Sequence, residues 1–245
     1  LMNKKAYGPP PIGWRNIFKP SMYKRLFAKT FGFPQGNATI EIRQLAKTYD
    51  GKPPVRALND VSFTMRLGES IVLIGPNGSG KSTLINSVTG FKACDCGELY
   101  VNGEKIEEGF LYMQDHLGVC FQDFIAFNRL TVIDHLRFFA TLRGFTGNEV
   151  DEEVNSLASM LRLEDSLNTR AKDLSGGQKR KLCIAMALSG RPPFIAMDEP
   201  TANIDSPTRQ IIWKTLASYN DSTILVTTHS VEEAECMASR VFVIN

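Results

Sequence analysis

The sequence lacks any hydrophobic run that could cross a membrane, because a spanning helix needs about 18 or more consecutive apolar residues. Histidine is scarce, with three residues, and the five cysteines are an odd number whose spacing suggests no disulfide framework. Cys94 and Cys96 have no second pair and no nearby histidine, so we expect no metal site there. The net charge of +2 argues neither for nor against a nucleic-acid partner. From composition we expect a reduced, cytosolic α/β domain.

The first 36 residues differ from the rest of the chain. They contain seven lysines or arginines, no acidic residue precedes Glu41, and three consecutive prolines occur among scattered aromatic residues. Such a segment either lies against anionic lipid headgroups or is a linker that packs on its own domain. A cleaved targeting peptide is not expected, because the prolines interrupt an amphipathic helix. We therefore divide the chain into a basic, juxtamembrane linker over 1–36 and a folded domain over 37–245.

The two ends predict that the chain is a fragment of a longer protein. It begins at Leu1 instead of methionine, and it stops at Asn245 directly after the apolar run 241–244. We expect the C-terminal end of the domain to be truncated.

A glycine-rich loop carries the strongest chemical signal. The apolar, β-branched run Ser70–Ile74 predicts a buried strand, the pattern G-x-x-x-x-G-K-[ST] follows in full, and a helix pattern comes next. The loop consists of Gly75, Pro76, Asn77, Gly78, Ser79, Gly80, Lys81, Ser82 and Thr83. In this context the backbone N–H groups and the helix N-terminus bind phosphate. Lys81 then reaches the β- and γ-phosphates, and the Ser82 hydroxyl binds Mg²⁺.

Three further candidates stand at the ends of predicted core strands. The apolar run Phe194–Met197 is followed by Asp198 and Glu199, and His229 comes just after a β-branched strand over 223–227. Open α/β sheets bind their ligands at the carboxyl ends of strands. We therefore assign Asp198 to Mg²⁺, Glu199 to the attacking water and His229 to a γ-phosphate contact.

The remaining pattern predicts how the domain is built. Alternating residues over Thr39–Tyr49, followed by Val55–Leu67, predict an N-terminal antiparallel β subdomain, and helical spacing predicts an inserted helical subdomain over about 123–172. Ser175 is expected to cap a helix whose glycine pair either binds an anion or forms an ordinary turn. Tyr49, at a strand end, either stacks on a nucleobase or packs in the core.

In this order the motifs resemble the nucleotide-binding domain of ABC transporters, over about residues 38–245. Residues 75–83 match its Walker A motif, 194–199 its Walker B motif with the catalytic glutamate, and 174–178 its LSGGQ signature. Single residues also match: Tyr49 the A-loop, Gln122 the Q-loop, Asp205 the D-loop and His229 the H-loop. The resemblance implies a P-loop NTPase core of the RecA-like type that binds ATP and Mg²⁺. It adds Gln122 to the metal ligands and to the catalytic residues, and Tyr49 and Asp205 to the nucleotide-binding residues.

Several short stretches of the sequence resemble the A subfamily, whose members export lipids and sterols. The relevant stretches are 118–122, 130–136 and 227–235. Phe121 departs from that pattern, where the subfamily usually has proline, and Asn203 departs from it, where the subfamily usually has glycine.

The resemblance also implies partners. In the family, the Walker A motif of one domain faces the signature of another, so that Ser175, Gly176, Gly177 and Gln178 would act in trans. A second nucleotide-binding domain, of the same or a sister chain, and the transmembrane domains of a parent transporter are therefore expected, with this domain at the cytoplasmic face and no nucleic acid bound. The apolar stretch 121–130 is either a socket for the membrane domain or core. Two alternatives remain: a soluble ABC ATPase acting on ribosomes or DNA, and a weakly hydrolysing regulatory module.

Overall fold

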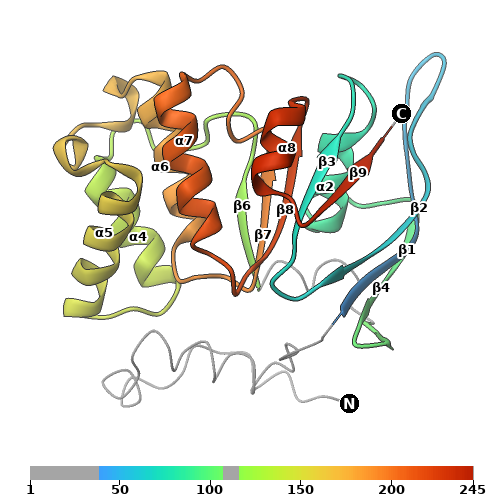
Figure 1. Cartoon of the computed structure of the whole chain (residues 1–245), viewed down its shortest axis with the longest axis horizontal. Coiled ribbons are helices and arrows are strands. Elements are labelled where there is room, and N and C mark those ends of the chain that lie inside the picture. Colours follow the sequence, from blue (N-terminus) through green and yellow to red (C-terminus); the bar gives the residue numbers. More distant parts are fainter. Residues whose placement is uncertain (1–38, 107–115, 245) are drawn as a thin grey trace.

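The computed structural model describes residues 39–106 and 116–244 (Figure 1). The linker predicted over 1–36 and the last residue of the chain lie outside the described residues, so the lipid-headgroup hypothesis stays a prediction. Within the described ranges, no helix is both long and apolar enough to cross a membrane.

The described residues form two sheets, and the first of them is antiparallel. It consists of β1 (Thr39–Tyr49), β2 (Val55–Arg66), β4 (Cys96–Val101) and β5 (Glu104–Lys105), in the order β2-β1-β4-β5. The alternation in β1 turns Ile40 and Ile42 into the core, where both are fully buried. Ile40 pairs with Met65 of β2 on one side and with Val101 of β4 on the other. The predicted antiparallel sheet is confirmed, and β4 joins it from beyond the phosphate loop.

The second sheet is parallel and carries the phosphate loop. It consists of β3 (Ser70–Ile74), β6 (Leu117–Cys120), β7 (Phe194–Asp198), β8 (Thr223–Thr228) and β9 (Arg240–Val243), in the order β6-β7-β8-β3-β9. Ile74 pairs with Thr228, and Asp198 pairs with Thr227. The carboxyl ends of β3, β7 and β8 therefore finish side by side, which brings the three predicted catalytic segments to one edge.

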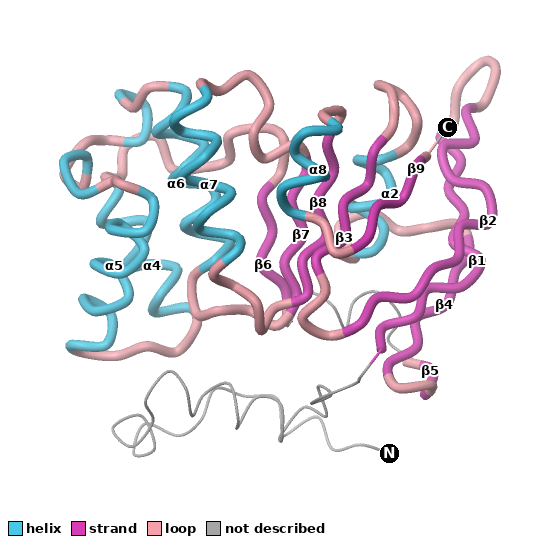
Figure 2. Tube along the Cα trace, in the orientation of Figure 1, coloured by secondary structure: helices cyan, strands magenta, loops and turns pink. Residues whose placement is uncertain are grey.

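Helices cover the parallel sheet and form one end of the molecule. They are α2 (Lys81–Val88), α4 (Val132–Leu142), α5 (Asn148–Leu161), α6 (Gly176–Leu188), α7 (Ser206–Ala217) and α8 (Val231–Met237). Figure 1 shows the parallel sheet between the helices α4 to α7 on one side and the antiparallel sheet on the other, and Figure 2 shows the same separation of helices from strands. The buried apolar residues of the described ranges form two clusters, one among the helices and one between the two sheets, and β3 contributes to both. Val72 packs with the helices, whereas Ile71 and Leu73 pack between the sheets.

Two short elements near the end of the chain were not predicted. α8 and β9 contain seven and four residues, which is too few for a clear periodic pattern. β9 pairs with β3 and forms the edge of the parallel sheet.

Candidate functional site

The phosphate loop joins β3 to α2, and two of its glycines permit a close approach of the backbone. A Cβ atom on Gly75 would lie 2.4 Å from the carbonyl oxygen of Ile244, and one on Gly80 would lie 2.4 Å from that of Ala57. Gly80 also has a φ angle of 97°, a left-handed conformation that is costly for other residues. The curled path of the loop therefore depends on glycine at both positions.

The loop ends at a helix start that is suited to an anion. α2 has no side-chain cap and no acidic residue in its first turn, so no group of its own first turn occupies the N–H groups at its positive end. Ser79 Oγ is buried without a hydrogen-bond partner among the described residues, and a phosphate oxygen would supply one. Lys81 Nζ donates to the carbonyl oxygens of Gly75 at 2.9 Å and Pro76 at 3.0 Å. These groups fit a bound polyphosphate.

Lys81, Glu199 and His229 form one row at the carboxyl edge of the parallel sheet. Lys81 Nζ lies 3.8 Å from Glu199 Oε1, and His229 Nδ1 lies 3.6 Å from Glu199 Oε2. The side chains of Lys81 and Glu199 are largely buried, whereas that of His229 is 61% exposed. A fixed cation, a carboxylate and an imidazole at one place suit phosphoryl transfer to water.

Thr227, which no sequence motif marks, contacts both predicted acidic residues: the carboxylate of Asp198 and the backbone of Glu199. Its hydroxyl donates to Asp198 Oδ1, and the Glu199 N–H donates to its carbonyl oxygen at 3.1 Å and to its Oγ1 at 3.0 Å. Glu199 has a φ angle of 46°, which is uncommon for such a residue and typical of functional sites. Buried Asp198 and the exposed Ser82 hydroxyl are oxygen donors of the kind that Mg²⁺ prefers.

The signature segment forms the first turn of α6. In a capping box, Ser175 Oγ accepts from the Gln178 N–H at 3.3 Å, and Gln178 Oε1 accepts from the Ser175 N–H at 2.9 Å. Gln178 Nε2 also donates to Ser166 Oγ at 2.8 Å, so its side chain is used within the chain. Ser175 and Gly176 are exposed. Across the described ranges, no hydrogen bond or ion pair joins this turn to the phosphate loop, and its role in trans stays a prediction.

Arg180 holds the backbone of Gln122 in place. Arg180 of α6 donates from Nη1 to the carbonyl oxygen of Phe121 and from Nη2 to that of Gln122, both at 2.7 Å. The Gln122 side chain is exposed. Sequence reasoning missed Arg180, because no local pattern shows that α6 reaches this loop.

Tyr49 and Asp205 stand at the ends of different elements, the last residue of β1 and the N-cap of α7. Tyr49 Oη is 3.3 Å from Thr83 Oγ1, which places the ring beside the start of α2. Asp205 caps α7, and the N–H of Thr208, which donates to it at 3.1 Å, lowers the pKa of Asp205. A Cβ atom on Gly177 would lie 3.7 Å from Asp205 Oδ1, so the signature turn and Asp205 are neighbours.

The two departures from the subfamily pattern have structural explanations. Asn203 has a φ angle of 58°, a left-handed conformation that asparagine tolerates almost as glycine does. Phe121 packs its ring edge-on against Phe91, with the centroids 5.0 Å apart. Neither residue belongs to the row of Lys81, Glu199 and His229.

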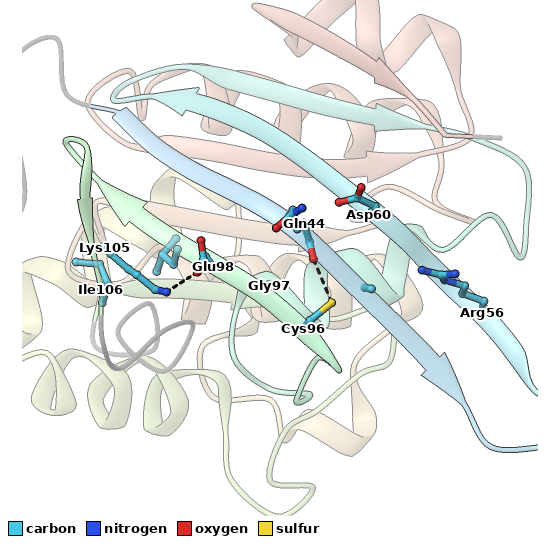
Figure 3. Close-up of a pocket in the computed structure, with 10 residues that line it drawn as sticks. Gln44, Arg56, Asp60, Cys96, Gly97, Glu98, Lys105 and Ile106 are labelled. Atoms are coloured by element: carbon cyan, nitrogen blue, oxygen red, sulfur yellow. Dashed lines mark hydrogen bonds and ion pairs between the residues drawn. The ribbon is translucent and has the colours of Figure 1, made fainter.

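A separate hollow of 630 Å³ lies on the antiparallel sheet (Figure 3). None of the predicted site residues lines it. Several of its polar groups bind one another: Lys105 donates to Glu98, and Cys96 Sγ donates to the carbonyl oxygen of Gln44. Arg56 and Asp60 stand on β2 at its other side (Figure 3). The hollow has no part in the site described above.

Comparisons with known proteins point to one family. A family model described as "ABC transporter" matches residues 58–202. The chain is 39% identical over 209 residues to ABC transporter A family member 2 of Dictyostelium discoideum, covering 84% of this chain and 13% of that protein. It is 36% identical over 206 residues to the phospholipid-transporting ATPase ABCA3 of Homo sapiens, covering 83% of this chain and 12% of that protein. The chain thus spans about an eighth of the length of these relatives.

Solved structures show the same fold. A dimeric, post-hydrolysis structure of the ATP-binding cassette MJ0796 bound to ADP and Pi superposes with a TM-score of 0.76 at 28% identity. The superposition covers 84% of this chain and 94% of that one. The predicted P-loop NTPase fold, with its antiparallel β subdomain and inserted helices, is confirmed.

Proposed function

The chain belongs to the ABC transporter family, and on that premise we propose that it is the ATP-binding and ATP-hydrolysing motor domain of a membrane transporter that moves lipids. The observation that carries the proposal is the row of Lys81, Glu199 and His229 beside an uncapped phosphate loop. The lipid assignment is supported by the similarity to a protein named as a phospholipid-transporting ATPase. The domain would lie at the cytoplasmic face of the membrane.

The chain's own residues supply most of the expected chemistry. The loop 75–83 would bind the phosphates, Lys81 would neutralise charge on the β- and γ-phosphates, and Tyr49 would stack on the adenine. Ser82, Gln122 and Asp198 would hold Mg²⁺, which offsets the negative charge of the triphosphate when it is bound. Glu199 would orient the attacking water, and His229 would contact the γ-phosphate.

A second nucleotide-binding domain would complete the site. Ser175 and Gly176 are exposed at the positive end of α6, where nothing from their own phosphate loop bonds to them within the described ranges. A neighbouring domain could therefore present its ATP to this turn. Hydrolysis would remove the γ-phosphate that joins the two domains, so that they separate.

The membrane domain would dock on exposed apolar side chains that follow Gln122. The Phe127 side chain lies on the surface, 57% exposed, and contacts Phe138 with ring centroids 5.9 Å apart. Ile125 is exposed as well, whereas Phe124 packs against the core of the helices. Within the stretch 121–130, Phe127 and Ile125 thus fit a socket, and Phe124 fits a core position.

The proposal is tested by titrating the full chain with Mg-ATP in a calorimeter and by measuring turnover. We expect Glu199→Gln to keep the parental affinity while its kcat falls by about 10²- to 10³-fold, because the variant loses only the group that orients water. Lys81→Ala should lose most of the affinity, whereas Lys214→Ala, on the exposed last turn of α7, should keep it. A parental protein that does not bind Mg-ATP, or a Glu199→Gln variant with parental kcat, would contradict the proposal.

A further inference from the structure

Glu233 of α8 is a buried carboxylate close to the site, and none of the motifs assigns it a role. Its side chain is 5% exposed. Thr201 Oγ1 donates to its Oε1, Thr228 Oγ1 donates to its Oε2, and Arg209 Nε of α7 lies 3.7 Å from Oε1. A buried carboxylate without partners is very costly. Thr201, Thr228 and Arg209 must therefore stay in contact with Glu233, and its position fixes theirs.

One branch of this cluster leads to His229. Thr228 is the last residue of β8 and directly precedes His229. Its hydroxyl donates to Glu233 and accepts a hydrogen bond from the N–H of Ser230 at 3.0 Å. The residues on both sides of His229 are therefore fixed through one hydroxyl that Glu233 orients.

The other branch leads to the loop between Glu199 and Asp205. Thr201 lies two residues after Glu199, and the neighbouring N–H of Ala202 donates to the Glu199 carbonyl oxygen at 3.2 Å. Arg209 reaches the far end of the same loop, where its Nη2 donates to the carbonyl oxygen of Ile204 at 3.4 Å. The cluster thus contacts both ends of the loop 200–205 and the turn of His229. Figure 1 shows α8 beside α7 and in front of the parallel strands, where it can make these contacts.

We propose that Glu233 is a positioning residue that holds His229 and the loop 200–205 in one mutual arrangement, so that the γ-phosphate contact and Asp205 move together. The proposal rests on the ATPase function proposed above. Glu233 acts through Thr228 and Thr201, and it does not touch the nucleotide. Separation of the two domains after hydrolysis would then be sensed at His229 and passed to Asp205 through this carboxylate.

The direct test observes His229 by NMR in the full chain. The chain has three histidines, at 116, 135 and 229, so their ring signals are separable after ¹³C labelling of histidine. We expect Glu233→Gln to shift or split the His229 signal. The amide nitrogen of the new side chain cannot accept a hydrogen bond, so the hydroxyl of either Thr201 or Thr228 loses its acceptor. Glu235→Gln removes the same charge from an exposed residue of the same helix α8 and should leave the signal in place. A folded Glu233→Gln protein with an unshifted His229 signal would overturn the proposal.

A kinetic test follows the same residues. Glu233→Gln should lower kcat by about tenfold to a hundredfold, as a displaced catalytic group does, with little change in the affinity for Mg-ATP. Thr201→Val, which keeps the carboxylate, should act in the same direction and serves if Glu233→Gln does not fold. If the parent hydrolyses ATP and both folded variants match it, the role of Glu233 is refuted while the ATPase function stands. A parent that does not bind Mg-ATP refutes the proposed function instead.

Discussion

Single residues in this domain are placed by partners that lie far from them in the sequence. Glu199 keeps a left-handed backbone because its N–H donates to two oxygens of Thr227 on the neighbouring strand, the carbonyl oxygen and Oγ1. That conformation directs the carboxylate to a position between Lys81 and His229. The strain of about 1–3 kcal/mol expected for such a residue is held where orientation matters for the chemistry.

Glu153 of α5 gives a prediction that depends on pH. Burial raises the pKa of Glu153, although the Gly190 N–H, which donates to it at 2.9 Å, partly opposes this. A raised pKa in the folded state contributes stability below the unfolded pKa, and this contribution is lost as pH rises through the folded pKa.

Glu153→Gln should therefore unfold with the parental free energy at pH 4 and with a free energy about 0.5–1 kcal/mol higher at pH 8, a usual size for one site. Urea unfolding at both pH values measures this difference. Glu152→Gln, an exposed neighbour with the same change of charge, should show no such pH dependence. Equal behaviour of the two variants would show that burial does not disfavour the charged form of Glu153.

At the scale of elements, the strand, the glycine loop and helix α2 act as one unit. Two glycines of the loop have left-handed φ angles but different surroundings: a Cβ on Gly80 would lie 2.4 Å from the Ala57 carbonyl oxygen, whereas one on Gly78 would meet nothing within 4 Å. The close approach of β2 to the loop thus decides which glycine cannot be replaced.

We expect Gly78→Ala to lower the free energy of unfolding by about 1–2 kcal/mol, the cost of a left-handed alanine. Gly80→Ala should lower it by more, because the Ala57 carbonyl must also move. Urea unfolding without nucleotide isolates this effect from contacts with phosphate. A Gly80→Ala protein that is as stable as Gly78→Ala would show that the Ala57 carbonyl does not hinder a Cβ atom at position 80.

At the scale of the whole molecule, the helical end and the strand-rich end carry different halves of the proposed site. The phosphate loop lies at the end of β3, near the antiparallel sheet, and the signature turn begins α6 on the helical side (Figure 1). A site completed by a second domain predicts that two defective proteins can complement each other. Lys81→Ala and Ser175→Arg should each be inactive alone.

Mixing these two variants should restore ATP hydrolysis, because each mixed dimer contains one site with an intact phosphate loop and an intact opposing signature. A coupled assay of phosphate release measures the activity. Mixing two portions of Lys81→Ala is the control and should stay inactive. If the mixture stays inactive while the parent hydrolyses ATP, the signature does not act in trans.

The surface that follows Gln122 gives a second prediction at this scale. In the parent transporter, Phe127→Ala should leave ATP hydrolysis and stability intact and should lower transport severalfold, because its exposed ring would contact the membrane domain. Phe124→Ala should mainly lower the melting temperature, because that ring is partly buried and packs against the core of the helices. Transport, ATPase and melting measurements on both variants separate the two roles. Parental transport by Phe127→Ala would remove this ring from the proposed socket.

Local sequence was sufficient for the elements and loops that are determined by their own residues. The strand Phe194–Asp198, the cap at Ser175 and the glycine loop before Lys81 each depend on periodicity, capping or turn chemistry within a few residues. The order of these motifs also identified the family and the fold. The strand, the cap and the glycine loop each needed only neighbouring residues, because the interactions that form them are local.

Only the tertiary structure decided which distant groups meet. Arg180 holds the backbone of Gln122, Glu233 joins Thr201 to Thr228, and Phe124 turns inward while Phe127 turns outward. These contacts link residues that are up to 58 positions apart. A single sequence contains no periodic or capping signal for such pairs, because they form only when the sheets and helices pack together.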